Sequence, residues 1–293
     1  MSGWDPGRLP VYFPAAAHNF RMGIMLTIKN KEFTELIEFI RSNYGINLIH
    51  KRTLIEGRLS NIIIERGFDS FGSYLKKVFS DTTGAEITQL VNKLTTNHTF
   101  FMREANHFKY FNDVVLPGIA GSKTRDMRVW SAGCSSGEEP YTLAMIIHDY
   151  LGEERKNWDT RLLATDISVK ALEKAERGVY RQEDMLEVPK KWKLNYFKTL
   201  KDEAFQICDE IRNDVIFRIF NLMEPQFPFK RKFHVIFCRN VMIYFDPKTK
   251  NELAEKFYDC LEPGGYLFIG HSESLNREAT RFRYIMPAVY RKG

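Results

Sequence analysis

The chain has 293 residues, of which 44% are hydrophobic and 14% aromatic, so it can bury the core of one large or two modest globular units. This composition excludes a disordered, collagen-like or coiled-coil protein. No uncharged apolar stretch approaches the roughly 18–20 residues that cross a bilayer, and no signal pattern opens the sequence, so we expect a cytoplasmic protein without membrane insertion. The formal charge of +6 favours an acidic partner only weakly.

The cysteines lie far apart and form no Cys-x-x-Cys pair. They are Cys134, Cys208, Cys238 and Cys260. This spacing argues against a zinc site and against a disulfide framework. We therefore expect reduced, mostly buried thiols and no metal ion.

Residues 1–27 carry three of the eleven prolines and no clean periodicity, so we expect an irregular extension there. Residues 28–96 are predicted to form a small all-α domain, because their apolar residues recur at intervals of three and four. Gly45 stands where the first helix would end, and Ser70 stands at the N-cap position of the third. The apolar stripes are Phe33, Leu36, Ile37, Ile40 and Tyr44; Leu54, Ile55, Leu59, Ile62 and Ile63; Phe71, Tyr74, Leu75, Val78 and Phe79; and Ile87, Leu90, Val91 and Leu94.

After about residue 105, short buried strands alternate with helices. This pattern predicts an α/β fold, a doubly wound and mostly parallel sheet with helices on both faces. The expected strands are 127–132, 161–165, 215–220, 233–238 and 266–270, and the expected helices are 140–151, 168–177 and 247–261. The apolar residues 282–291 suit an antiparallel hairpin at the edge of the sheet. Residues 179–214 break the alternation, and we interpret them as a small β insertion with a strand at 204–208.

Open parallel sheets bind ligands where the strands end, so the loops that follow the strands are the first place to look for function. The loop after the first strand contains Gly133 and Gly137, followed by Glu138 and Glu139. Two acids would repel a pyrophosphate but suit a cationic ligand or ribose hydroxyls, which disfavours NAD and ATP. The alternative is a tight turn whose acids complement the helix dipole.

Polar residues also follow the later strands. Asp166 ends the second strand, where it can accept hydrogen bonds from both hydroxyls of a ribose or can cap the helix that begins near Ser168. Asn221 and Asn240 each precede an apolar residue, Leu222 and Val241, a combination that suits the edge and face of an adenine. Each asparagine alone is more often a turn residue. Together the strand ends favour a cationic adenosine compound without phosphate, which is S-adenosylmethionine.

The sequence resembles the chemotaxis-receptor protein-glutamate O-methyltransferases, the CheR family. The resemblance runs from about residue 30 to residue 291. It is carried by residues 94–104 (LTTNHTFFMRE), 130–141 (WSAGCSSGEEPY), 164–167 (ATDI), 238–246 (CRNVMIYFD) and 261–274 (LEPGGYLFIGHSES). It implies a helical N-terminal domain, a linker at 97–110 that contributes to the cofactor site, and a methyltransferase domain at 111–293 with a small β subdomain.

The resemblance also implies roles for individual residues. Asn97, Thr99 and Arg103 would line the cofactor site from the linker, and Glu139 and Asp166 would hold polar groups of the cofactor. The later strand ends would frame the cofactor through Asn221, Leu222, Asn240 and Val241. Arg103 would pair with a carboxylate of the cofactor or of the substrate glutamate. Tyr244 would orient the nucleophile, or else it packs against the adjacent helix.

The implied reaction transfers a methyl group from S-adenosylmethionine to receptor glutamates and leaves S-adenosylhomocysteine. A glutamate side chain, with a pKa of about 4.3, is already ionised at neutral pH, so no general base is needed. Consistently, we find no Pro-Cys nucleophile and no Asp/Asn-Pro-Pro-aromatic motif of base methylation. Catalysis is therefore expected to come from positioning.

Lys51 and Arg58 lie seven residues apart and would fall on nearly one face of the second helix. An ordinary solvated face is one interpretation. The resemblance implies another, in which these cations dock the acidic helical bundle of a receptor and bring a monomeric enzyme to the membrane receptor arrays. A nucleic-acid methyltransferase and a non-catalytic cofactor-binding regulator are the rival functions, and the first lacks the motifs of base modification.

Overall fold

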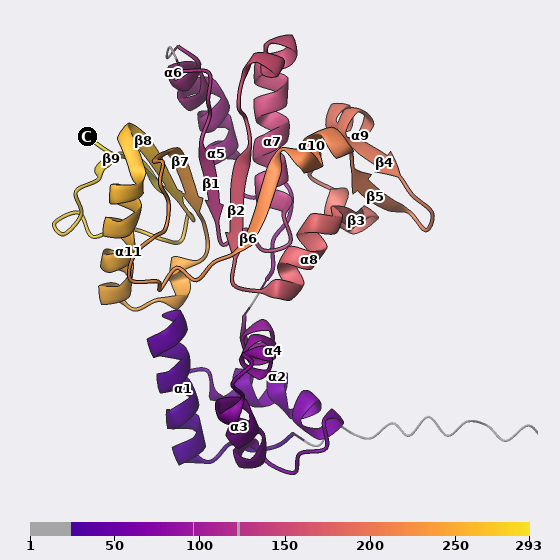
Figure 1. Cartoon of the computed structure of the whole chain (residues 1–293), viewed down its shortest axis with the longest axis vertical. Coiled ribbons are helices and arrows are strands. Elements are labelled where there is room, and N and C mark those ends of the chain that lie inside the picture. Colours follow the sequence, from indigo (N-terminus) through magenta and orange to yellow (C-terminus); the bar gives the residue numbers. More distant parts are fainter. Residues whose placement is uncertain (1–24, 96, 122–123) are drawn as a thin grey trace, which may run out of the picture.

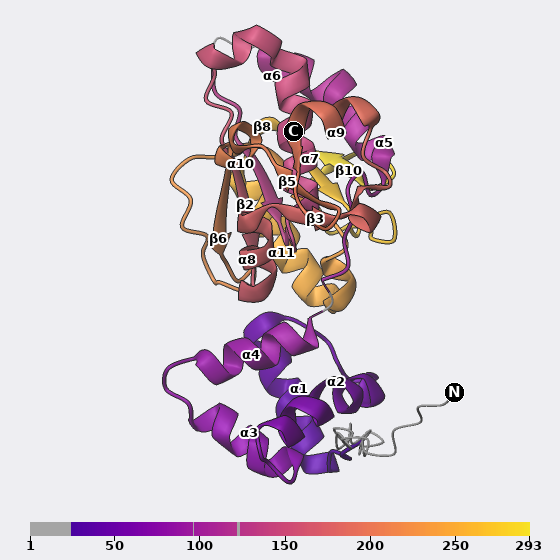
Figure 2. The same ribbon diagram turned by 90° about the vertical axis from the view of Figure 1, so that its right-hand side faces the viewer.

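The computed structural model describes residues 25–95, 97–121 and 124–293. Residues 1–24 of the expected N-terminal extension lie outside the described residues. Figures 1 and 2 show a helical module below and a sheet covered by helices above. No helix in the described ranges is long and apolar enough to cross a membrane.

The helical module consists of α1 (Asn30–Tyr44), α2 (Arg52–Glu65), α3 (Phe71–Ser80) and α4 (Ala85–Leu94), which confirms the prediction of an all-α N-terminal domain. The predicted stripes pack into one core, in which Leu36, Leu59 and Tyr74 are fully buried. The caps act as the sequence predicts: the Ser70 side chain accepts a hydrogen bond from the Ser73 N–H, and Gly45 ends α1 in the left-handed conformation.

The end of the predicted linker and the segment that follows it are helical, although the sequence pattern did not predict helices there. It contains α5 (Ala105–Tyr110), the π-helical segment η1 (Phe111–Val115) and α6 (Leu116–Ala120). These elements bury aromatic side chains against the sheet: the ring of Phe108 stacks on that of Phe237 at 6.2 Å. Each element is too short to show a helical period, and so tertiary packing decides its conformation.

The described residues form a seven-stranded sheet in the order β6-β2-β1-β7-β8-β10-β9. Strands β1, β2, β6, β7 and β8 run parallel, whereas β10 pairs antiparallel with both β8 and β9. This confirms the predicted α/β fold with its terminal hairpin. The bounds are β1 (Val129–Ala132), β2 (Leu162–Asp166), β6 (Val215–Ile219), β7 (Phe233–Cys238), β8 (Leu261–Ile269), β9 (Arg283–Met286) and β10 (Val289–Arg291).

The three helices predicted between the strands are present and cover the sheet. They are α7 (Glu138–Leu151), α8 (Val169–Arg177) and α11 (Pro247–Cys260). The Asp246 side chain accepts a hydrogen bond from the Thr249 N–H, and Pro247 follows at the first helical position. Several boundaries differ from the prediction. Helix α7 begins at Glu138 rather than at Pro140. Strand β8 begins at Leu261 rather than at Tyr266, because Leu261 already pairs with Phe233 before a shift in register.

The insertion forms a small antiparallel sheet at the side of the main sheet (Figure 1), as predicted. Its strands are β3 (Val179–Arg181), β4 (Phe197–Thr199) and β5 (Ala204–Ile207), in the order β3-β5-β4. Two short helices flank it, α9 (Lys190–Tyr196) and α10 (Asp209–Asn213). Tyr180 of β3 is buried and donates a hydrogen bond to the Ser136 carbonyl, so the insertion packs against the loop that follows β1.

Two hydrogen bonds to backbone carbonyls join the helical module to the α/β domain. The Asn47 N–H donates to the Tyr244 carbonyl at 2.8 Å. Asn221 Nδ2 donates to the Asn43 carbonyl at 2.7 Å. Both bonds reach the turn that ends α1, where Gly45 has φ 71° and a Cβ atom would lie 2.5 Å from Met223 Sδ. A glycine is required here by its backbone conformation and by the close approach of the two domains.

We predict that Gly45→Ala lowers the free energy of unfolding by about 1–2 kcal/mol, because alanine is strained at positive φ and meets Met223. Gly57→Ala within α2 is the matched control. A Cβ there meets nothing within 4 Å, so the control is expected to raise stability by about 0.5–1 kcal/mol. Urea denaturation of both variants measures the difference, and equal effects would contradict the assigned strain.

Candidate active site

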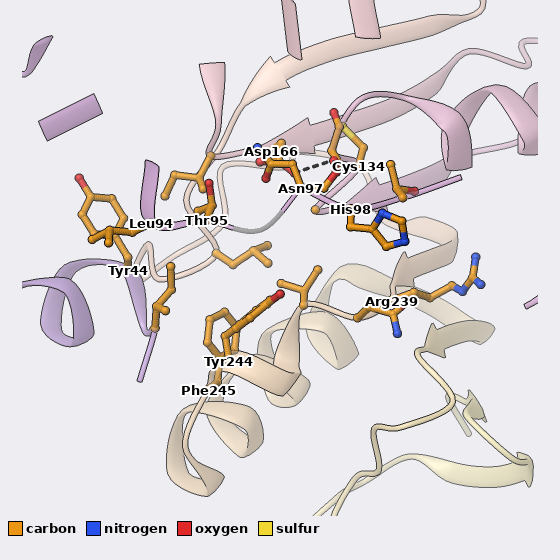
Figure 3. A pocket seen from close by; sticks show the side chains of 18 of the residues that line it. Tyr44, Leu94, Thr95, Asn97, His98, Cys134, Asp166, Arg239, Tyr244 and Phe245 are labelled. Atoms are coloured by element: carbon orange, nitrogen blue, oxygen red, sulfur yellow. Dashed lines mark hydrogen bonds between the residues drawn. The ribbon is translucent and has the colours of Figure 1, made fainter. Parts of the chain in front are cut away.

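A cavity of about 330 Å³ lies where β1, β2, β6 and β7 end, between the sheet and the helical module. Figure 3 shows Asp166, Asn97 and Cys134 on one side of it and Tyr244 and Phe245 on the other. Every residue that the sequence assigned to cofactor binding, catalysis or docking lines this cavity: Asn97, Thr99, Arg103, Glu139, Asp166, Asn221, Leu222, Asn240, Val241, Tyr244, Lys51 and Arg58. The tertiary structure therefore brings them together.

The loop between β1 and α7 is a tight turn that packs against the end of β2 and the loop after β7. The N–H groups of Gly133 and Cys134 both donate to the Thr165 carbonyl, at 2.7 and 2.9 Å. Gly133 has φ 84°, and a Cβ atom on it would lie 2.4 Å from Val241 Cγ2. The glycine thus keeps the backbone of this loop against the end of β7 and open toward the cavity.

The Asp166 carboxylate fixes two loops through backbone donors. Oδ2 accepts from the Ser135 N–H and Oδ1 accepts from the Ser168 N–H, each at 2.8 Å. Ser168, not Asp166, is the N-cap of α8, because its hydroxyl accepts from the Ala171 N–H. Burial raises the pKa of Asp166, although the backbone N–H groups act in the opposite direction. A carboxylate has about four lone-pair sites, so it retains capacity for hydroxyl donors.

The linker lies across these loops. Asn97 Nδ2 donates to Ser168 Oγ at 3.1 Å, and the Asn97 carbonyl accepts from Ser135 Oγ at 2.9 Å. Farther along, Arg103 Nη1 donates to the His98 carbonyl at 3.0 Å. Asn97 is therefore held at the cavity by bonds to the loops that follow β1 and β2, whereas the Arg103 side chain is bonded within the linker.

Glu139 is held by protein groups on both of its oxygens. Oε1 accepts from Ser131 Oγ at 2.7 Å, and Oε2 accepts from Arg239 Nη1 at 3.0 Å. Arg239 also donates to Glu104 Oε2 from Nε and Nη2, at 3.3 and 3.1 Å. Burial raises the pKa of Glu139, which the Arg239 charge opposes. Burial would also raise the pKa of Glu104, but Arg239 and the His271 N–H bring it below its ordinary value.

The two asparagines at the later strand ends use their amides within the protein. Asn221 Oδ1 accepts from the Met223 N–H at 3.0 Å, while its Nδ2 reaches the helical module. Asn240 has φ 58°, and its Nδ2 donates to Glu104 Oε1 at 3.3 Å. These contacts are those of turn residues. Both asparagines still line the cavity beside Leu222 and Val241.

Lys51 and Arg58 do not share one face of α2, contrary to the prediction. Lys51 is the N-cap residue that precedes α2, so it does not lie on the helix. Arg58 is not a simple solvated charge, because Nη1 donates to the Leu94 and Thr95 carbonyls at 2.6 and 3.2 Å. It therefore fastens the end of α4. Both residues border the cavity.

Tyr244 belongs to the short helix η4 (Met242–Tyr244). Its hydroxyl points into the cavity in Figure 3, opposite Asn97 and Asp166. The ring is therefore placed beside the ligand space rather than packed fully against α11.

One group of described residues resembles a metal site. Donor atoms of Glu104, His107 and His271 lie within 4.8 Å of one another. However, the Glu104 oxygens already accept from Arg239, from Asn240 Nδ2 and from the His271 N–H. A divalent cation would have to displace these donors beside a guanidinium, so the geometry favours a hydrogen-bond network at this position.

Sequence reasoning missed Arg239 and Glu104, although both lie within stretches that it singled out. A signal was present, because Arg239 directly follows the apolar strand 233–238 and a buried arginine needs anionic partners. The sequence did not indicate which carboxylates those partners are. Glu104 and Glu139 lie 135 and 100 positions away along the chain.

Comparisons with known proteins agree with this geometry. Residues 97–290 match the family model for the SAM binding domain of CheR methyltransferase, and residues 31–95 match its all-alpha domain. A chemotaxis protein methyltransferase from Borreliella burgdorferi is 43% identical over 93% of this chain and 98% of the relative. The protein of the same name from Escherichia coli is 37% identical over 90% of this chain and 92% of the relative.

We predict that the neutral, buried His107 makes the fold sensitive to acid. Burial lowers its pKa to about 4, with the Arg239 charge acting in the same direction. Between pH 6.5 and 4 the unfolded chain binds a proton that the folded chain does not, so stability present above pH 6.5 is lost as the pH falls. Between pH 6.5 and 4.5 this loss amounts to about 2 kcal/mol.

Urea denaturation across this pH range measures the loss. His107→Leu is expected to remove the part of the loss that His107 contributes and to leave the part from His234, whose pKa burial also lowers to about 4. His50→Leu, on an exposed side chain, is expected to retain the whole loss. An unchanged pH dependence in His107→Leu would refute the assignment.

Proposed function

The chain belongs to the CheR methyltransferase family, and from this premise we propose that it transfers the methyl group of S-adenosylmethionine to glutamate side chains of chemotaxis receptors. The product would be S-adenosylhomocysteine. The observation that carries the proposal is the convergence of every predicted cofactor residue on one cavity at the carboxyl ends of the parallel strands.

The residues around this cavity fit such a cofactor. Asp166 presents a carboxylate with remaining acceptor capacity, which suits ribose hydroxyls. Glu139 and Glu104 share one arginine, so the three groups together carry excess negative charge, which suits a cationic ligand. Gly133 has no side chain where the backbone borders the cavity. A pyrophosphate would meet repulsion from the same carboxylates.

We assign the roles as follows. Asp166 binds the ribose, while the apolar side chains of Leu222 and Val241 contact the adenine, with Asn221 and Asn240 holding the turns that present them. Glu139 holds the amino group of the methionine portion, and Asn97, Thr99 and Arg103 bind its carboxylate. When bound, S-adenosylmethionine supplies an electrophilic methyl group. Tyr244 orients the acceptor carboxylate by a hydrogen bond from its hydroxyl.

The residues of the chain then promote the reaction by holding the acceptor carboxylate in line with the methyl group. The acceptor glutamate, with an ordinary pKa of about 4.3, arrives ionised, and no side chain must take a proton from it. Alignment of the carboxylate oxygen with the methyl group can account for about 7–11 kcal/mol of barrier lowering. The roles of Arg103 and Tyr244 are therefore binding and orientation, without general-base catalysis.

The receptor would approach from the helical module. Lys51 is exposed and borders the cavity, so a cation stands where an acidic receptor helix would bring its glutamate. We therefore keep Lys51 as a docking residue and treat Arg58 as a residue that also holds the linker. The enzyme is proposed to be a cytoplasmic monomer recruited to membrane receptor arrays, with no nucleic acid as substrate.

The test of the function uses the protein with labelled S-adenosylmethionine and the cytoplasmic fragment of a chemotaxis receptor. Carboxyl methylation is expected to give label on the receptor that base releases as methanol. A receptor fragment whose methyl-accepting glutamates are changed to alanine is the control and is expected to stay unlabelled. Label on nucleic acid, or cofactor binding without transfer to any receptor, would overturn the proposal in favour of one of its rivals.

We predict that Lys51→Glu lowers kcat/KM for the receptor by about threefold at low ionic strength, because a reversed charge at the docking edge repels an acidic helix. The loss should shrink as salt screens the interaction. Lys156→Glu is the charge-matched control on an exposed residue near the C-terminal end of α7. Initial rates at two salt concentrations measure both effects. Equal losses in the two variants would contradict specific docking at Lys51.

A further inference from the structure

Arg239 is the first residue after β7, and its side chain is only 2% exposed. It meets groups from two other parts of the chain: Glu104 and the Arg103 carbonyl in the linker, and Glu139 at the start of α7. The Phe108 ring lies 5.0 Å from its guanidinium carbon. One buried cation therefore joins the linker, a strand end and a helix start.

The pattern of donors requires an arginine. Nη1 serves Glu139, Nε and Nη2 serve Glu104, and Nη2 also donates to the Arg103 carbonyl. The planar guanidinium presents these donors in a fixed fork. A lysine would keep the charge, but its single nitrogen cannot reach the two carboxylates and the carbonyl with the same geometry.

The bond to the Arg103 carbonyl has the most direct consequence. It fixes the backbone of Arg103, whose side chain lines the cavity, while the bond from the other terminal nitrogen, Nη1, fixes the Glu139 carboxylate. Asn240, the next residue, adds a bond from Nδ2 to Glu104, and its N–H donates to Glu273. The strand end is thus held on both sides.

We propose that Arg239 is a positioning residue that sets the distance between Arg103 and Glu139 and so shapes the end of the cavity that receives the amino-acid portion of the cofactor. This inference rests on the proposed function. It assigns no contact of Arg239 with the reacting atoms.

Calorimetric titration of the wild-type protein with S-adenosylhomocysteine comes first. Binding by the wild type is required by the proposed function, and its absence would overturn that function and this inference together. If the wild type binds, the variants test Arg239 alone. Arg239→Lys keeps the charge and removes the fork, and Arg239→Met removes both.

The matched control is Arg128→Lys. Arg128 precedes β1 and is 18% exposed; it also joins two carboxylates, those of Asp126 and Glu262. It lies at the end of β1 opposite the cavity, because β1 runs from Val129 toward the loop at Gly133. It therefore reproduces the chemistry of a bridging arginine without contact to the proposed site.

We expect Arg239→Lys to raise the dissociation constant of S-adenosylhomocysteine by about tenfold or more, and to raise KM for S-adenosylmethionine by a similar factor with a smaller effect on kcat. Arg128→Lys is expected to keep the dissociation constant and KM within about twofold of the wild-type values, even if its melting temperature falls as much as that of Arg239→Lys. A purely structural Arg239 would lower the melting temperature and leave the dissociation constant within twofold in Arg239→Lys, and this result would overturn the proposal.

Arg239→Met leaves two buried carboxylates without their cation, and it is expected to weaken binding further than Arg239→Lys does. If neither Arg239 variant folds, Glu104→Gln tests the same connection from the linker side. It weakens the bonds to Arg239 and keeps the Arg239–Glu139 pair. An increase of about threefold or more in the dissociation constant supports positioning through the linker, and an unchanged value overturns it.

Discussion

Parallel strands that end at one edge of a sheet bring polar groups close together. In this protein the helical module covers that edge, so these groups must find hydrogen-bond partners largely within the protein. In this protein, carboxylates meet much of that requirement. Asp166 accepts backbone N–H groups from two loops, and Glu273 accepts those of Asn240 and Ile243. The backbone N–H groups of the cavity loops are thus held by side-chain carboxylates. These bonds fix the course of the loop backbone.

Burial of this many acids has an electrostatic consequence. Burial raises the pKa of Glu139 and Asp166, which means that their ionised forms are costly in the ligand-free protein. Arg239 compensates two of the carboxylates, Glu104 and Glu139, with a single charge. A cationic ligand in the cavity would relieve the remaining imbalance. The charges that make the site costly to form are therefore those that would favour the cationic cofactor proposed above over a nucleotide.

The helical module forms part of the site, in addition to any role in docking. Tyr44, Ile46 and Leu54 line the cavity, and the end of α1 is bonded to Asn221 and to the Tyr244 backbone. A substrate that contacts the module would thus act on residues that also enclose the cofactor. In this arrangement Lys51, which we propose docks the receptor, and Tyr244, which we propose orients the acceptor, border the same space, although they come from different domains.

By itself the sequence determined most of the helices and strands and the candidate site residues, although it did not predict α5, η1 and α6. Apolar spacing and caps such as Ser70 and Asp246 are local signals, because a helix buries one face and must satisfy its first N–H groups. Only the tertiary structure decided which polar and charged groups meet. Asn221 reaches Asn43 across 178 positions and Arg239 reaches Glu104 across 135. No periodicity encodes such pairs, because hydrogen-bond partners are chosen by distance in space after the chain has folded.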